Sequence, residues 1–401
     1  MRKPNPMIFP LLLICAEMLA YLSNDMYLPA LPVLMRDFGV GADQIQLSLS
    51  AWFLGSMSMQ LVVGPLSDRI GRRPVLICGM VLFVLSTLLC ILAPQFEYLI
   101  LARFVQGSTV CFIVVAGYAS IHELFDQKNA IHLLARMSSV VVLAPALGPL
   151  IGGFILSGAS WQWTFWPLFI LGLVILILLV KWMPEPLSPN RRHPLKISLL
   201  AKQYRALLCN SRFLLLLLTN SFIFCGFIAW LCAGPFFVIQ QFHYPPFVFG
   251  LLQMLIFSFF ILSTHLVKRF MDRLGIPGLI IRGLGITLVG GVLATLTAFL
   301  LPDYLSGLIL GMVFYAFGFG LCTAPLQRLA IEASTIPMGL RMALLSTSLG
   351  FFGFLATTLV QLSYNGKLSS LAIILLVTTI VAILTFLLRQ AEPKVNLTPL
   401  N

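Results

Sequence analysis

Three ionisable side chains lie inside long apolar stretches of the sequence. Glu17 and Asp25 fall within residues 8–30, and Arg103 falls within residues 98–120. A charged side chain in hydrocarbon costs at least about 2.5–3.5 kcal/mol, so each of the three calls for a specific role. A carboxyl group there changes its protonation as water, a proton or a cationic ligand occupies the space beside it. That competition is the chemistry that an antiporter requires.

The spacing of the two acids predicts that they share one face of a helix. Glu17, Tyr21 and Asp25 stand at positions i, i+4 and i+8, which drift by only about 80° over a rise of about 12 Å. All three side chains can therefore line one water-filled groove. Two alternatives stay open for Asp25: beside Asn24 and Pro29 it tethers a kinked helix, or it pairs permanently with the buried arginine.

The buried arginine also has two possible roles. Arg103 is followed by Gln106 and Gly107, which continue a polar face of small residues. It could relay protons through a carboxylate or water, or it could hold the fourth helix to the first by a hydrogen-bonded ion pair. The expected proton- and substrate-coupling residues are thus Glu17, Asp25 and Arg103.

The elements that must position these residues are membrane-spanning helices. The chain is 59% hydrophobic and 9% charged, whereas soluble proteins carry about 25% charged residues, so a soluble fold is excluded. A span needs about 20 apolar residues. Charge clusters and Gly/Pro turns divide the chain into twelve such stretches: 8–30, 46–66, 75–94, 98–120, 134–157, 163–183, 213–238, 246–267, 279–300, 304–325, 339–363 and 368–388.

The basic residues indicate the orientation of the spans. With twelve spans both termini lie on one side, and assigning that side to the cytoplasm places 22 of the 25 Lys and Arg residues there. Only Arg36 and Lys367 fall on the opposite side, and Arg103 lies within a span. The net charge of +12 is therefore mostly a topology signal.

A repeat indicates two halves. Asp68-Arg69-Ile70-Gly71 follows the second stretch, and Asp272-Arg273-Leu274-Gly275 follows the eighth. A Pro-containing basic segment falls between the sixth and seventh stretches. We expect an all-α membrane protein with a bundle of six helices in residues 1–183, a cytoplasmic linker in 184–212 and a second, pseudo-symmetric bundle in 213–401. Paired bundles with a site near the midplane are typical of transporters.

Other chemistries lack the residues that they need. The eight cysteines show no paired short spacing, so they predict neither disulfides nor a metal site. The five histidines are scattered and no nucleophile motif appears, so we expect no enzyme, no metal and no cofactor. The basic residues form no runs with interleaved aromatic residues, so no nucleic-acid partner is expected. Nothing resembles a repeated selectivity filter, which disfavours a channel.

The segment between the second and third stretches carries a long motif. Residues 64–74, Gly-Pro-Leu-Ser-Asp-Arg-Ile-Gly-Arg-Arg-Pro, resemble the signature of the major facilitator superfamily. In that family the motif is a conformational latch, so the resemblance implies gating rather than substrate contact. Gly64 would permit close helix approach, and Asp68 could meet a helix N-terminus or a basic partner. The gating set is Gly64, Asp68, Arg69, Gly71, Arg72 and Arg73.

The fifth stretch carries a second motif. Residues 144–153, Ala-Pro-Ala-Leu-Gly-Pro-Leu-Ile-Gly-Gly, look like the antiporter signature of drug exporters in this superfamily. Its small residues at intervals of four allow close helix packing, and its prolines bend the span. Packing alone could select such a pattern, but the resemblance favours efflux. The motif residues are Pro145, Gly148, Pro149 and Gly152.

Residues 24–32, Asn-Asp-Met-Tyr-Leu-Pro-Ala-Leu-Pro, are similar to the first-helix motif of the Bcr/CflA drug-resistance transporters. That resemblance implies that the acids on the first helix couple protons to substrate. It also places Tyr21 and Asn24 in the substrate pocket and Glu123 at the cytoplasmic end of the fourth helix. The second half agrees in its spans more than in its motifs, because Ile276-Pro277 stands where the first half has Arg72-Arg73.

We therefore expect a proton-coupled antiporter that exports lipophilic compounds, which can be cationic, by alternating access. The alternative is an exporter of one endogenous metabolite, such as a siderophore or a sugar, on the same scaffold. The expected partners are small lipophilic substrates, protons and the lipid bilayer. We expect a monomer in the bacterial inner membrane with both termini in the cytoplasm.

Overall fold

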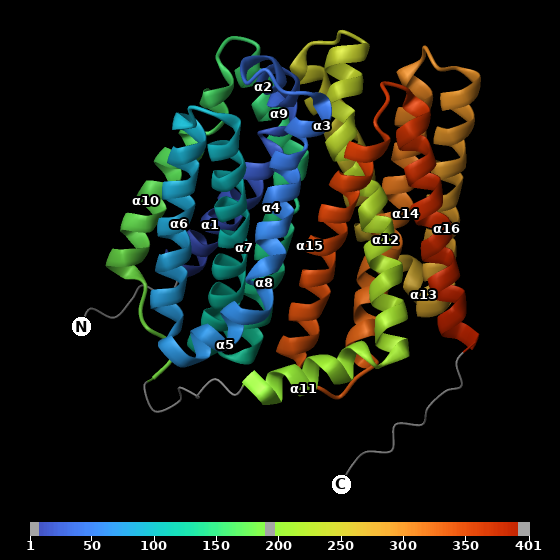
Figure 1. The fold of residues 1–401 in the computed structure, drawn as a ribbon. Helices are drawn as coiled ribbons and strands as arrows, with labels where there is room; N and C mark the ends of the chain where they lie inside the picture. Colours follow the sequence, from blue (N-terminus) through green and yellow to red (C-terminus); the bar gives the residue numbers. More distant parts are fainter. Residues whose placement is uncertain (1–7, 189–196, 392–401) are drawn as a thin grey trace.

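The computed structural model describes residues 8–188 and 197–391, which form helices that run roughly side by side (Figure 1). The first six crossings are made by α1 (Ile8–Asp25), η1 (Leu28–Ala30) and α2 (Leu31–Asp37); α3 (Ala42–Ile45), α4 (Leu47–Ser58) and α5 (Gln60–Ile70); α6 (Arg72–Leu92); α7 (Phe96–Leu124); α8 (Gln127–Val141) and α9 (Ala144–Leu156); and η2 (Trp161–Thr164) and α10 (Trp166–Trp182). The remaining elements are α11 (Ile197–Leu208), α12 (Ser211–Pro235), the π-helical η4 (Phe236–Gln241), α13 (Pro246–Leu300), α14 (Leu305–Glu332), α15 (Met338–Ser363) and α16 (Leu368–Ala391).

Twelve crossings follow from the lengths of these helices. Within the described ranges, nine helices are long and apolar enough to span a membrane, and a pair bent by 43°, Ala42–Ser58 with Gln60–Ile70, makes a tenth. The 55 residues of α13 would extend about 80 Å, far more than a hydrocarbon core of about 30 Å. Gly275 interrupts α13 with a φ of 67° and divides it into two crossings. The two shorter helices α8 and α9 together make the fifth crossing, so the predicted all-α architecture of twelve spans is confirmed.

The first crossing is broken where the chemistry was predicted. Pro29 has no N–H with which to bond the carbonyl of Asp25, four residues earlier, and α1 ends at Asp25. The chain then passes through a turn into η1 and α2 rather than continuing as one straight helix. Asp25 therefore lies at a helix end inside the protein, where it is 5% exposed.

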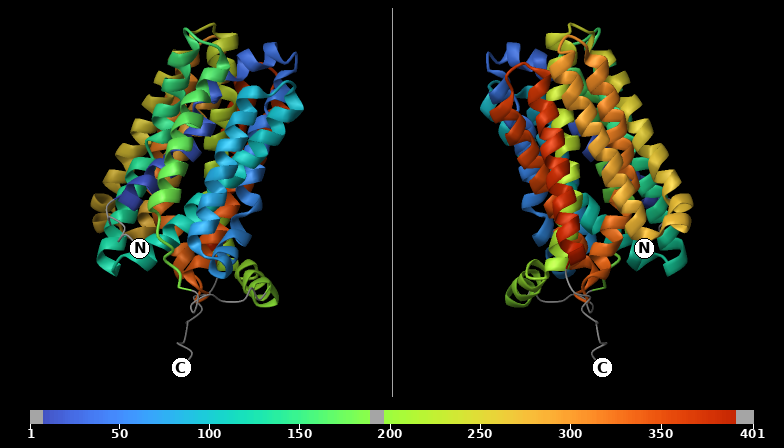
Figure 2. Two further views of the ribbon diagram at one scale, coloured as in Figure 1. Left: turned by 90° about the vertical axis from the view of Figure 1, so that its left-hand side faces the viewer. Right: turned by 90° about the vertical axis from the view of Figure 1, so that its right-hand side faces the viewer.

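The two ends of the molecule differ in their elements. In Figure 1 α2 and α3 lie at the top, whereas α5 ends at the bottom, where α11 runs across the ends of the spans. Both side views in Figure 2 show α11 at the same end, away from α2 and α3. We call these ends the α2–α3 side and the α11 side. The helix α11 lies within the segment that the sequence predicts as a linker; residues 189–196 of that segment are outside the described residues.

The helices of the first and second halves meet along two seams. In one seam α4 packs against α15, and the Ser50 hydroxyl bonds the Thr357 hydroxyl at 2.7 Å. In the other, α9 packs against α13 so closely that a Cβ on Gly250 would lie 2.3 Å from the Cα of Leu150. Glycine is required at such a contact because the two backbones nearly touch.

Candidate functional site

Glu17 lies on α1 and is almost completely buried, with 2% of its surface exposed. The Tyr118 hydroxyl of α7 donates a hydrogen bond of 3.0 Å to Glu17 Oε1. The second oxygen, Oε2, is buried without a hydrogen-bond partner among the described residues. One turn further along α1, Tyr21 is partly buried and packs against the surrounding core. A carboxyl group with one free buried oxygen has the capacity to hold a proton or to accept a bond from a ligand.

Asp25 is the last residue of α1 and lies beside the antiporter motif. The amide nitrogen of Asn24 is 3.4 Å from Asp25 Oδ1, a long hydrogen bond. A Cβ on Gly148 would lie only 2.6 Å from the Asp25 Cβ, and one on Gly152 would lie 2.1 Å from the carbonyl oxygen of Met26. Any larger residue at either glycine would push α9 away from the end of α1.

Arg103 of α7 is fully buried and reaches the broken end of α1. Its Nη1 donates to the Ser23 carbonyl at 2.9 Å and to Gln106 Oε1 at 2.6 Å, and its Nη2 donates to Asn24 Oδ1 at 2.9 Å. The guanidinium also lies over the ring of Tyr27, 4.6 Å from the ring centre. Arg103 therefore ties the fourth span to the first. The direct ion pair with Asp25 that the sequence allows is not one of these bonds.

The fifth-span motif has a structural break at its start. α8 ends at Val141 and α9 begins at Ala144, with Pro145 in its first turn. Proline is accommodated there because the first N–H groups of a helix have no partner within the helix. Pro149 lies inside α9, and its carbonyl oxygen would be 2.7 Å from a Cβ on Gly250. The motif thus packs against α1 with Gly148 and Gly152, and against α13 beside Pro149.

The gating motif forms a charged cluster on the α11 side. Gly71 has a φ of 116°, which lets α5 turn directly into α6. Arg72 Nη2 lies 2.5 Å from Asp68 Oδ1 and 3.0 Å from Glu123 Oε1. The carboxylate of Glu123 therefore links the end of the fourth span to the start of the third. Arg69 is exposed.

Two details of this cluster differ from expectation. A Cβ on Gly64 would have Val115 Cγ1 as its nearest neighbour at 3.7 Å, an ordinary van der Waals distance, so the close approach predicted at Gly64 is not present. In addition, the carboxylate of Glu185, after the sixth span, accepts bonds from the backbone N–H groups of Arg72 at 3.0 Å and Arg73 at 3.3 Å. Glu185 thereby caps the first turn of α6, where N–H groups lack partners and negative charge is favourable.

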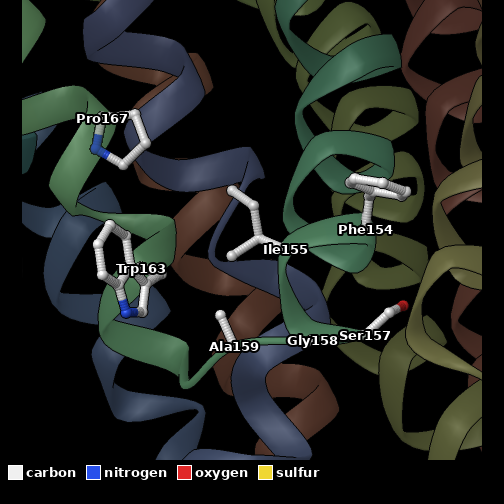
Figure 3. A pocket seen from close by; sticks show the side chains of 7 residues that line it. All are labelled: Phe154, Ile155, Ser157, Gly158, Ala159, Trp163 and Pro167. Atoms are coloured by element: carbon white, nitrogen blue, oxygen red, sulfur yellow. The ribbon is translucent and has the colours of Figure 1, made fainter.

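A separate hollow of about 490 Å³ lies between the end of α9, η2 and the start of α10, and Figure 3 shows the side chains that line it. It is bordered by Phe154 and Ile155 of α9, Trp163 of η2 and Pro167 of α10. Among the residues that the structure describes, no ionisable side chain borders it, and Glu17, Asp25 and Arg103 are not part of its lining. Among the described residues, no group of three or more His, Cys, Asp or Glu side chains is arranged to hold a metal ion.

The structure thus brings Asp25, Asn24 and Arg103 together, places Glu17 two turns away on the same helix, and gathers the gating residues at the opposite end of the spans from α2 and α3. Two participants were missed by the sequence reasoning. Tyr118 stands on the same helix as Arg103, and a search for polar side chains in that span would have found it. Glu185 carries no such signal, because its partners on α6 are more than 100 positions away.

The sequence and the structure both match known transporters. A profile described as Major Facilitator Superfamily matches residues 13–356. The multidrug transporter MdfA of Yersinia pestis is 34% identical over 353 residues, which cover 88% of this chain and 85% of the relative. The chloramphenicol resistance protein CraA of Acinetobacter baumannii is 32% identical over 363 residues, 90% of this chain and 86% of that protein. A crystal structure of a D-xylose–proton symporter, 16% identical, superposes with a TM-score of 0.74 over 93% of this chain and 96% of the symporter.

Proposed function

Because this chain belongs to the major facilitator superfamily, and is therefore a multi-pass membrane transporter, we propose that it is a proton-coupled antiporter that exports lipophilic compounds, cationic ones included. The observation that carries the proposal is the pair of buried carboxyl groups on α1, Glu17 and Asp25, beside the buried Arg103. Buried ionisable groups inside a membrane mark proton and substrate pathways.

The proposed cycle uses competition for the acids. A proton taken from the outside neutralises Asp25 or Glu17, and bound drug leaves. The two halves then rock, and a new substrate from the cytoplasm displaces the proton to that side. Residues 1–183 and 213–401 would be the moving halves, with 184–212 as the linker. The two seams, α4 with α15 and α9 with α13, are the surfaces across which that motion would occur.

The α11 side would face the cytoplasm. It carries Arg69, Arg72 and Arg73, and positively charged residues gather on the cytoplasmic side of bacterial membrane proteins. Both termini would then be cytoplasmic, and the protein would lie in the bacterial inner membrane. A single chain would form the whole pathway, so we propose a monomer.

Aromatic side chains of the second half support lipophilic substrates. Phe227 of α12 packs against Phe257 of α13 at 5.3 Å between ring centres and against Phe319 of α14 at 5.7 Å. Phe260 of α13 joins this cluster, 5.3 Å from Phe319. Such rings offer large apolar contacts without fixed hydrogen-bond demands, which suits ligands of variable shape. The names of the relatives, a multidrug transporter and a chloramphenicol resistance protein, point to the same substrate class.

The substrate proposal is tested by export from cells. Bacteria that lack their own drug exporters and carry this gene should accumulate less tetraphenylphosphonium and less chloramphenicol than cells with an empty vector. Their secreted metabolites are compared in the same cultures. Lower accumulation of several unrelated lipophilic compounds supports the proposal. Unchanged drug accumulation together with increased secretion of one metabolite would replace it with the narrower exporter.

A further inference from the structure

Asn24 stands between the two buried charges of the first half and contacts both. Its side-chain oxygen Oδ1 accepts a hydrogen bond of 2.9 Å from Arg103 Nη2. Its side-chain nitrogen Nδ2 is 3.4 Å from Asp25 Oδ1. One amide group therefore connects the guanidinium to the carboxyl group, and Asn24 itself is 5% exposed.

The other acceptors of Arg103 make this connection distinctive. The Ser23 carbonyl, Gln106 Oε1 and Asn24 Oδ1 are all formally neutral, and Nε of Arg103 is buried with no hydrogen-bond partner in residues 8–188 and 197–391. Gln106 in turn donates to the Thr87 hydroxyl at 2.9 Å and so belongs to a network on the third and fourth spans. Of the three acceptors of Arg103, Asn24 is the one whose own side chain also contacts an ionisable group.

The position of Asn24 near the end of α1 relates this connection to the contact between the first and fourth spans. α1 ends at the next residue, and beyond the Leu22 carbonyl, which accepts the Met26 N–H at 2.9 Å, the last carbonyls of a helix have no partner within it. Arg103 satisfies one of them, that of Ser23, and a cation at a helix C-terminus is favourable. The hold of the fourth span on the broken end of the first therefore depends on how Arg103 is oriented.

We infer that Asn24 is a positioning residue that transmits the protonation of Asp25 to Arg103, an inference that rests on the proposed function. A carboxylate is a stronger acceptor than a neutral carboxyl group. When Asp25 is charged, it holds the Asn24 N–H, and the amide oxygen then faces Arg103. When Asp25 is neutral, that bond weakens, and Arg103 loses one of the two acceptors, Asn24 Oδ1 and the Ser23 carbonyl, through which it holds α7 on the end of α1. Asn24 thus belongs to the coupling apparatus, in addition to any contact with substrate.

Other titratable groups surround this part of α1 and must be included in any pH measurement. α1 itself carries Glu17 and Tyr21, and Tyr27 follows it. Four neighbouring helices also carry titratable groups: Arg103, Cys111 and Tyr118 on α7, Cys90 on α6, the exposed His132 and Arg136 on α8, and Lys181 at the far end of α10. The face of α9 that packs against Asp25 carries glycine instead. A variant of Asn24 leaves all of these groups in place.

The test measures proton release on ligand binding. Purified full-length protein in weakly buffered detergent is mixed with tetraphenylphosphonium, and released protons are followed with an indicator dye from pH 5 to pH 9. Three variants are compared with the wild type: Asn24→Leu removes the amide and keeps a similar side-chain volume, Asn24→Ala removes the amide without adding bulk or charge, and Gln106→Leu removes a different bond to Arg103.

We expect the pH midpoint of release to move upward by about one unit in Asn24→Leu and Asn24→Ala, because the carboxylate loses its donor. Gln106→Leu should leave the midpoint in place, although it can weaken binding. If Asn24→Leu does not fold, Asn24→Ala alone decides. Midpoints equal to the wild type in the folded Asn24 variants would overturn the inference. No ligand-dependent proton release from the wild type would instead overturn the proposed function.

Discussion

The two halves repeat one backbone turn but do not repeat its chemistry. Gly71 and Gly275 both have positive φ, 116° and 67°, at the end of the same four-residue pattern. After Gly71 the chain continues with Arg72, which bonds Asp68 and Glu123. After Gly275 it continues with Ile276 and a proline, which carry no charge. The repeat therefore preserves the positive-φ glycine, whereas the ion pairs of Arg72 with Asp68 and Glu123 belong to the first half.

The interior shows the same contrast. In the first half Glu17, Asp25 and Arg103 are all buried within the spans. The buried polar side chains of the second half, within its described residues, are neutral: Thr219, Asn220, Ser221, Gln253, Ser263, Thr287, Thr357, Ser370, Thr378, Thr379 and Thr385. Equal backbone architecture thus accommodates one half with buried charges and one half whose described buried polar side chains are neutral. The following predictions test that division.

The largest effect is expected at Asp25. Asp25→Asn keeps the shape of the side chain but cannot exchange a proton, so proton-driven drug efflux should fall to the level of the empty vector. Drug accumulation in cells measures it, with the amount of inserted protein checked by gel filtration in detergent. Glu97→Gln, at an exposed acid next to the start of the fourth span, is the matched control and should transport normally. Efflux by Asp25→Asn at the wild-type rate would contradict the proposal that the buried acids of the first half couple protons to export.

The second largest effect is expected where the halves meet. Leucine in place of Gly250 would overpack the seam, since even a Cβ would lie 2.3 Å from the Leu150 Cα. Overpacking costs about 1–3 kcal/mol, which shifts a two-state equilibrium about 5- to 150-fold. The readout is the yield of a disulfide between the cysteines introduced by Ser50→Cys and Thr357→Cys, in protein without its native cysteines. In the Gly250→Leu variant this yield should fall, as expected for an equilibrium shifted by that factor.

The control for the seam is Gly285→Leu, because a Cβ at Gly285 would meet no atom within 4 Å from any other part of the described chain. It should leave the disulfide yield unchanged. Equal yields in the two leucine variants would show that the α9–α13 seam does not govern how the halves close.

A smaller effect separates the two motif copies. Arg72→Leu leaves Glu123 without its cationic partner and should lower the free energy of unfolding by about 1–3 kcal/mol. Arg273→Leu, at the exposed arginine of the second copy, should change it by no more than about 0.5 kcal/mol. Thermal unfolding in detergent measures both. Equal losses would mean that the second copy also works as a latch.

The smallest effect is expected in the neutral interior of the second half. Thr385→Val removes the bond of 2.9 Å to the Thr219 hydroxyl. Hydrogen bonds between membrane helices contribute about 0.6 kcal/mol on average, so the free energy of unfolding should fall by about that amount. Drug-linked proton release should not change. A changed pH dependence of transport in Thr385→Val would place part of the proton chemistry in the second half.

The sequence predicted the spans and the buried charges because both depend on local composition. Residues 8–30 read as apolar, and three ionisable side chains stood out against the apolar background. The break after Asp25 was foreseeable only as a kink at Pro29. The bonds that define the site were not predictable, because they join residues far apart in the chain: Arg103 and Asn24 are 79 positions apart, and Arg72 and Glu185 are 113 apart. Only three-dimensional packing decides which polar partner such a side chain finds.

The central claim, that protons drive export through the acids of the first half, is tested most directly in proteoliposomes whose internal and external pH are set independently. With purified protein and tetraphenylphosphonium, we predict that an imposed proton gradient drives the drug to the side from which protons flow, and that reversing the gradient reverses the drug. Asp25→Asn should show no response to either gradient. Drug movement that is independent of the gradient in the wild-type protein would contradict the account.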